Sequence, residues 1–101
     1  MRYTLLAMLA IATMNVDAAG GDAKKGEAKA GTCVACHGPQ GNSVNPAWPK
    51  LAGQHAAYLA KQLQAFKSGA RKDPLMAPQV MSLSDDDMNN LAAYFAAQKA
   101  K

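Results

Sequence analysis

Two cysteines and a histidine stand close together in the stretch CVACH, at positions 33, 36 and 37. On one helical turn, residues at i, i+3 and i+4 project from the same face. Cys33 and Cys36 can therefore add their sulfurs to the two vinyl groups of a haem, while His37 reaches the iron as an axial ligand. These are the only two cysteines in the chain. The spacing predicts one covalently attached haem c, with iron.

Two other chemistries use paired cysteines. A redox disulfide normally accompanies a thioredoxin-like βαβ pattern, and no stretch of this sequence is predicted as a strand. Structural zinc needs four ligands, usually from two separated pairs, and His55 is the one remaining candidate of the usual kind. Haem attachment is therefore the favoured interpretation, and a haem-free redox protein is a minor alternative.

The beginning of the chain has the pattern of an export signal. Arg2 supplies a positive charge, and residues 3–14 form a mostly apolar run that is too short to span a membrane as a helix. Small residues then occupy the positions that a signal peptidase reads, at 16–18. An uncleaved membrane anchor is disfavoured because Asn15 and Asp17 interrupt the run.

We therefore expect a cleavable signal peptide over residues 1–18, with the cut after Ala18 or Ala19, and a single domain over residues 19–101. The exported domain would lie in the periplasm, with no stable membrane insertion after cleavage. About eighty residues make a thin core, which a covalently held haem would staple. The net charge of +4 suits an acidic docking partner or has no particular meaning, whereas scattered lysines and export argue against nucleic acid.

The first predicted helix leads into the haem motif. Asp22 is a suitable N-cap, and Ala23, Gly26 and Ala30 share one face. Small side chains on that face would let another helix approach closely. We expect this helix to continue into Thr32 and the cysteines.

Two further helices follow irregular stretches that are rich in proline and glycine. One is expected from about residue 54 to 68, ended by Gly69, and one after the N-cap Ser84. Residues 71–83 between them are predicted as a loop, punctuated by Pro74 and Pro78. The apolar stripes of the two helices are Leu59, Leu63 and Phe66, and Met88, Leu91, Ala92 and Phe95.

With these features in place, the chain resembles a class I c-type cytochrome, of the small soluble bacterial monohaem kind, and looks like one half of the dihaem cytochromes of the c-four type. The likeness covers essentially the whole exported chain. It implies an all-α cytochrome c fold of three main helices, with loops wrapped around one haem and the outer helices crossing near Gly26 and Tyr94. The stretches that carry it are GDAKKG (21–26), CVACHG (33–38), WPKLAGQ (48–54) and LSDDDM (83–88).

In this family a methionine thioether binds the other face of the iron. Met88 lies on the apolar stripe of the last helix and is best explained as core. Met76 is preferred over Met81 because it stands between two prolines in the predicted loop, and because its distance before Leu83 fits the resemblance. His55 is instead expected to be an exposed residue in the first turn of the second helix.

Other residues receive weaker roles. The resemblance implies that the Pro49 carbonyl accepts the second ring N–H of His37. Trp48 would either bond a haem propionate or simply pack beside the haem. Tyr58 and Tyr94 are expected in the core or at the helix crossing.

An iron held by His37 and a methionine has no open site, so the resemblance implies a one-electron carrier between a redox-protein donor and acceptor of a respiratory chain, not an enzyme. The alternative is a haem peroxidase or gas-binding sensor in which the methionine dissociates. Basic residues would either steer acidic partners or form a merely solvated face. They are Lys50, Lys61, Lys67, Arg71 and Lys72.

Overall fold

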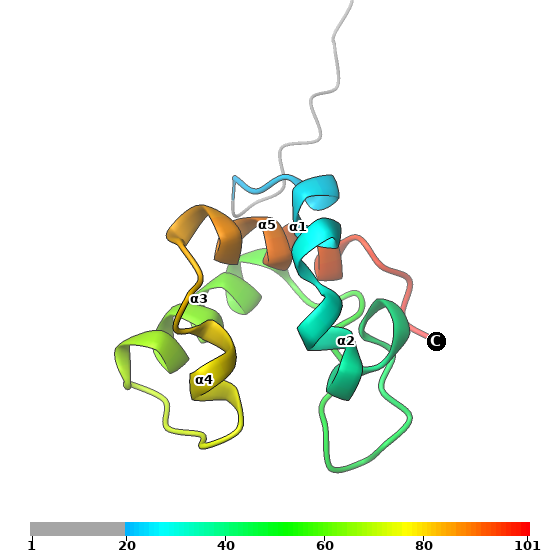
Figure 1. Cartoon of the computed structure of the whole chain (residues 1–101). Helices are drawn as coiled ribbons and strands as arrows, with labels where there is room; N and C mark the ends of the chain where they lie inside the picture. Colours follow the sequence, from blue (N-terminus) through cyan, green and yellow to red (C-terminus); the bar gives the residue numbers. More distant parts are fainter. Residues whose placement is uncertain (1–19) are drawn as a thin grey trace, which may run out of the picture.

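The computed structural model describes residues 20–101, and the expected signal peptide with its cleavage site lies outside these residues. The described chain consists of helices and connecting loops without strands, so the all-α prediction is confirmed (Figure 1). Within residues 20–101, no helix combines the length and apolar character needed to cross a membrane. The helices are α1 (Ala23–Lys29), α2 (Gly31–His37), the 3₁₀ turn η1 (Pro39–Gly41), α3 (Ala56–Ser68), α4 (Met76–Val80) and α5 (Asp85–Ala96).

The haem motif lies on a short helix of its own. Asp22 caps α1 as predicted, because its carboxylate accepts the N–H groups of Lys24 and Lys25 at 2.9 and 3.2 Å. At Ala30 the hydrogen bonds join residues three apart, as in a 3₁₀ turn. The Ala30 N–H donates to the Glu27 carbonyl, and the Ala30 carbonyl accepts from the Cys33 N–H. The prediction of one continuous helix into the motif is therefore wrong.

The two longer helices have the predicted end residues. α3 begins at Ala56, two residues later than expected, because His55 before it has an extended backbone; it ends at Gly69, which adopts the left-handed conformation. Before α5, the Ser84 hydroxyl accepts the N–H of Asp87 and the Asp87 carboxylate accepts the N–H of Ser84, both at 3.0 Å. This reciprocal capping box fixes where α5 starts.

The segment predicted as a loop over residues 71–83 contains a helix, α4. Its first N–H groups are satisfied by Asp73, whose carboxylate accepts from Leu75 at 2.8 Å and from Met76 at 3.1 Å. Pro78 is the third residue of α4, where a missing N–H removes no intrahelical bond. Met76 is thus the first residue of a short helix and not part of an irregular loop.

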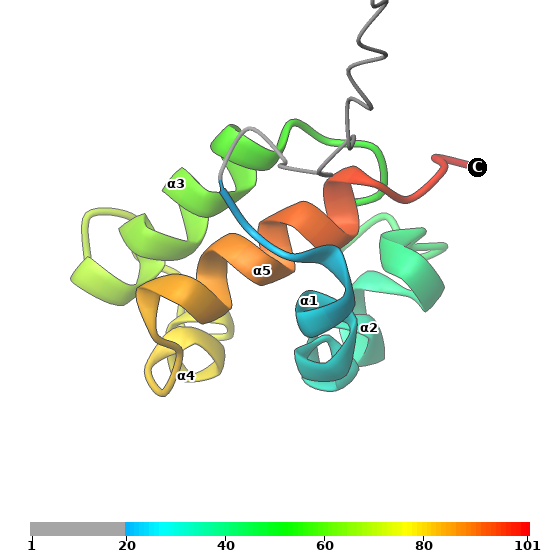
Figure 2. The same cartoon turned by 90° about the horizontal axis from the view of Figure 1, so that it is seen from above.

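α5 is the central element, crossed by α1 and packed against α3 (Figures 1 and 2). At the crossing, a Cβ on Gly26 would stand 2.0 Å from the Asn90 carbonyl oxygen and 2.8 Å from the Tyr94 Cβ. Only a glycine allows this approach, which confirms the crossing near Gly26 and Tyr94.

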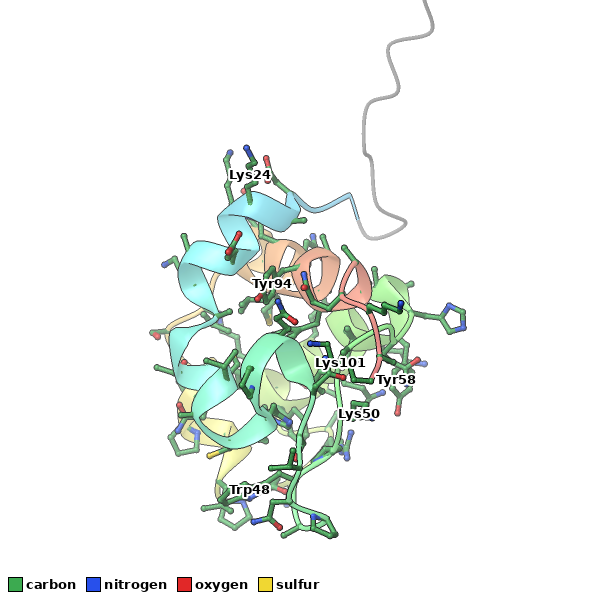
Figure 3. All side chains as sticks on the ribbon, turned by 90° about the vertical axis from the view of Figure 1, so that its right-hand side faces the viewer. Lys24, Trp48, Lys50, Tyr58, Tyr94 and Lys101 are labelled. Atoms are coloured by element: carbon green, nitrogen blue, oxygen red, sulfur yellow. The ribbon has the colours of Figure 1, made fainter. Side chains whose placement is uncertain are left out.

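The core is formed where α3 and α5 face each other. Met88 and Leu91 are each 1% exposed, and the rest of the predicted α5 stripe is also buried. Tyr58 is 48% exposed and lies on the outside of α3 (Figure 3), so the prediction that it belongs to the core or to the crossing is wrong. The main buried cluster is Ala30, Ala56, Leu59, Ala60, Leu91, Ala92 and Phe95.

Candidate haem-binding site

α2 carries both cysteines and the histidine. Cys33 is half-buried, Cys36 is exposed, His37 is buried, and both cysteines are free thiols. Burial raises the pKa of the Cys33 thiol, only partly opposed by its hydrogen bond with Thr32. A raised pKa favours the neutral thiol, whereas redox-active cysteines depend on a stabilised thiolate. The environment of Cys33 therefore counts against a redox disulfide.

The ring of His37 is held by one strong hydrogen bond. Its Nδ1 lies 2.7 Å from the carbonyl oxygen of Pro49, the acceptor that the resemblance implies. A carbonyl oxygen can only accept, so Nδ1 carries the hydrogen and Nε2 keeps its lone pair in the neutral ring. This is the tautomer in which Nε2 can bind a metal.

Pro49 belongs to a loop over residues 42–50, and hydrogen bonds join the two ends of this loop, which we call its neck. The Gly41 carbonyl accepts two N–H groups from the far side of the loop, from Leu51 at 2.8 Å and Ala52 at 3.2 Å. Trp48 is 36% exposed and lies near the tip of this loop, away from the helix crossing (Figure 3). The Pro49 carbonyl therefore belongs to a loop whose two ends are hydrogen-bonded to each other.

The three methionines of the described chain differ sharply in burial. Met76 is half-buried at the start of α4, Met81 is 61% exposed just beyond its end, and Met88 is 1% exposed inside the core. The prediction that Met88 is a core residue is confirmed. α4 and α2 lie on the same side of α5, on the left and right of Figure 1.

The structure also shows where His55 and Asp73 lie relative to the helices. His55 is exposed, as expected, but stands directly before α3 and not in its first turn. Asp73, which positions Met76, was not predicted as a site residue; the dipeptide Asp73-Pro74, a common turn initiator, is the signal that could have found it. Among residues 20–101, no cluster of three or more His, Cys, Asp or Glu side chains could hold a metal ion.

Some of the predicted basic residues have structural contacts. The Lys67 ammonium donates to the carbonyl of Leu83, and the Lys50 ammonium donates to the carbonyl of Lys101. Arg71 donates to Gln62 at 2.8 Å and stacks over the Phe66 ring at 4.6 Å. These cations are fixed in place by the fold, so their position alone is no evidence for a docking surface.

Comparison with known proteins assigns the chain to a family. Residues 23–99 match the family model for cytochrome c. The chain is 57% identical over 79 residues to cytochrome c4 of Thiocapsa roseopersicina, which is 77% of this chain and 41% of that protein. It is 46% identical over 82 residues to cytochrome c-554(548) of Halomonas halodenitrificans, which is 78% of this chain and 99% of that protein.

The fold is also similar to solved structures. Reduced recombinant cytochrome c4 from Pseudomonas stutzeri superimposes with a TM-score of 0.77 at 46% identity, over 80% of this chain and 47% of that chain. The chain thus spans less than half the length of these cytochrome c4 relatives, and nearly the whole length of the Halomonas protein.

Proposed function

Because this chain belongs to the cytochrome c family and its cofactor is therefore a covalently attached haem c, we propose that it is a periplasmic one-electron carrier and not an enzyme. The single observation that carries the proposal is the bond from His37 Nδ1 to Pro49. It leaves the lone pair of Nε2 free to bind iron, on the same short helix as two free thiols.

The residues present fit the haem. Cys33 and Cys36 would form the two thioether links, His37 would be one axial ligand, and Met76 the other. When bound, the haem supplies a couple between ferrous and ferric iron, and methionine ligation raises its reduction potential relative to two histidines. The half-buried position of Met76 favours it over Met81, which is 61% exposed.

The surroundings of Met76 favour electron transfer over peroxidase or gas-sensing chemistry. A peroxidase needs an open iron position with an acid–base group beside it. The nearest carboxylate in the sequence, Asp73, accepts the N–H groups of Leu75 and Met76. It thereby holds the methionine segment in place.

We further propose that residues 1–18 direct export and are removed after Ala18 or Ala19, which leaves the domain in the periplasm. Its partners would be a redox-protein donor and a redox-protein acceptor, docked through a small and transient contact. Exposed apolar side chains on the 42–50 loop and around α4 support such a contact, and they are Val44, Trp48, Leu75 and Met81.

The test uses protein made in a host that attaches haem c, together with Met76→Ala and the matched control Met81→Ala. The wild type and Met81→Ala should show the weak long-wavelength band of methionine bound to ferric iron, and Met76→Ala should lack it. Met76→Ala should also have a lower reduction potential and should bind carbon monoxide rapidly. Rapid binding of carbon monoxide by the wild type would instead support the sensor or peroxidase alternative, and a colourless product would reject haem altogether.

A further inference from the structure

The last three described residues lie against the 42–50 loop. We call residues 99–101 the tail segment. Both polar atoms of the Asn42 side-chain amide form hydrogen bonds with the tail segment. Nδ2 donates to the carbonyl of Lys99 at 3.0 Å, and Oδ1 accepts the N–H of Lys101 at 2.9 Å. These are contacts across 57 and 59 residues of sequence, made entirely to backbone atoms of the tail segment.

The tail segment touches both ends of the loop. Asn42 is the first residue of the loop and Lys50 is the last, and the Lys50 ammonium donates to the carbonyl of Lys101. Figure 3 shows Lys50 and Lys101 side by side. Pro49, whose carbonyl accepts from His37, directly precedes Lys50. The tail segment therefore bridges the two ends of the loop. One of its contacts, at Lys50, is one residue from Pro49, the acceptor of the His37 bond.

From this arrangement we propose that Asn42 is a positioning residue for His37: it fastens the tail segment across the 42–50 loop and so keeps the Pro49 carbonyl on Nδ1. The proposal rests on the proposed function, since it concerns the tuning of a His37-bound iron. A hydrogen bond from the outer ring nitrogen makes the imidazole a more basic ligand. A more basic ligand stabilises ferric iron, so loosening this bond raises the reduction potential.

The loop provides a matched control. Asn45 is exposed, and its carboxamide oxygen accepts the N–H of Ala47 at 2.9 Å, two residues further on. Asn42 and Asn45 thus have the same side chain and lie in the same loop. Only the first reaches the tail segment by a hydrogen bond in the described structure. If side-chain contacts within the loop were sufficient, replacing either asparagine would have the same effect.

The experiment compares the holoproteins of the wild type, Asn42→Ala and Asn45→Ala by redox titration and by proton exchange of the His37 Nδ1–H. Asn42→Ala should shift the ratio of reduced to oxidised protein at a fixed potential about threefold toward the reduced form, which for one electron is about 30 mV upward. Its Nδ1–H should exchange faster. Asn45→Ala should match the wild type in both measurements.

A shortened chain that lacks residues 99–101 provides a second route. It should reproduce the faster exchange of the His37 Nδ1–H, and adding Asn42→Ala to it should produce no further change in potential, because the two changes break the same link. If Asn42→Ala fails to fold, wild-type exchange in the shortened chain overturns the proposal. The proposal is equally overturned if Asn42→Ala leaves potential and exchange unchanged, or acts equally in both chain lengths.

These outcomes differ from a failure of the proposed function. In that case the wild type itself would lack attached haem, or would lack the methionine band. Here the wild-type spectrum is normal, and only the response to Asn42→Ala decides.

Discussion

The regions that carry the two proposed iron ligands are held in different ways. The proximal region, residues 31–53, is fastened by partners that are distant in sequence: the tail segment holds its loop, and Gly53 donates to the Phe95 carbonyl at the end of α5 at 3.0 Å. The distal region, residues 73–83, is held more by hydrogen bonds within itself, with one side-chain bond from outside, from the Lys67 ammonium to the Leu83 carbonyl. Asp73 caps α4 from within the region, and Val80 is its fully buried anchor.

This difference indicates two kinds of stability. A disruptive substitution in the proximal region should lower the stability of the whole fold, because the contacts of this region join the tail segment, the loop and α5. Damage to the distal region should remain local and should mainly affect the methionine ligand. Substitutions should therefore range in effect from a large loss of stability in the proximal region to small, local changes in and beside the distal region.

Two glycines with similar positive φ angles compare the neck of the proximal loop with the end of α3, just before the distal region. Gly41, at the neck of the proximal loop, has φ +79°, and an added Cβ would lie 2.8 Å from Phe95 Cδ1 and 3.0 Å from the Ala52 nitrogen. Gly69, which ends α3 before the distal region, has φ +82° and no atom within 4 Å of an added Cβ. Gly41→Ala should lower the free energy of unfolding by about 3 kcal/mol, through strain and overpacking.

Gly69→Ala should cost about 1 kcal/mol, because backbone strain is its only penalty. Denaturant unfolding of the holoproteins, followed by circular dichroism, measures both values. Equal losses in the two variants would contradict the contrast between a packed proximal neck and an open helix end.

The distal region should respond locally to Asp73→Ala. This variant removes the acceptor for the N–H groups of Leu75 and Met76, so the start of α4 should fray and hold Met76 less firmly. The methionine band of the ferric protein should weaken, and the Leu75 and Met76 amides should exchange faster, while the unfolding midpoint changes little.

Asp73→Asn is the control, since its amide oxygen can still accept both bonds, and it should restore most of the band. A large fall in the midpoint with an undiminished band would show that the distal region is not a separate local unit.

The smallest effect is expected where the distal region joins α5. A hydrogen bond from the backbone N–H of Ser84, with smaller contributions from its hydroxyl and from Lys29, holds the pKa of Asp87 below its usual value. A carboxyl group whose pKa is lowered by folding contributes stability above its unfolded value of about 3.9, and this stability is lost as the pH falls through the folded pKa.

Asp87→Asn should therefore be less stable than the wild type at pH 7, and the difference should shrink as the pH falls below about 4. Asp86→Asn is the control in the same helical turn, and it should change the pH dependence less, since the capping bonds come from Asp87. Thermal unfolding at several pH values measures this, and a constant difference between Asp87→Asn and the wild type at all pH values would reject the role.

Features that depend on local sequence were predictable. The capping residues Asp22 and Ser84, the left-handed Gly69 and the buried stripe of α5 all follow from the types of neighbouring residues, and the structure has each of them. The spacing of Cys33, Cys36 and His37 on one helix belongs to the same class, because it depends on the chemistry of a single turn.

Features that depend on distant partners were not predictable. Nothing near Asn42 in the sequence indicates that its amide reaches residues 99–101. Tyr58, in contrast, lies outside the predicted α3 stripe of Leu59, Leu63 and Phe66, so the stripe already indicated its exposure. The break at Ala30 and the helix α4 are a different case, because two alternative hydrogen-bond patterns were locally possible. The structure has bonds between residues three apart at Ala30, and it has the cap by Asp73 at the start of α4.

α5 connects the two regions along a single rigid element. It starts directly after the distal region, and the carbonyl of Phe95 near its end accepts from the proximal Gly53. Its 12 residues form a rod of about 18 Å, with its apolar stripe fully enclosed by the core. In the proposed carrier, such a rod would keep the spacing of the two ligands nearly the same in both oxidation states. Little nuclear rearrangement would then accompany each electron, and a small reorganisation energy is what allows fast exchange at modest driving force.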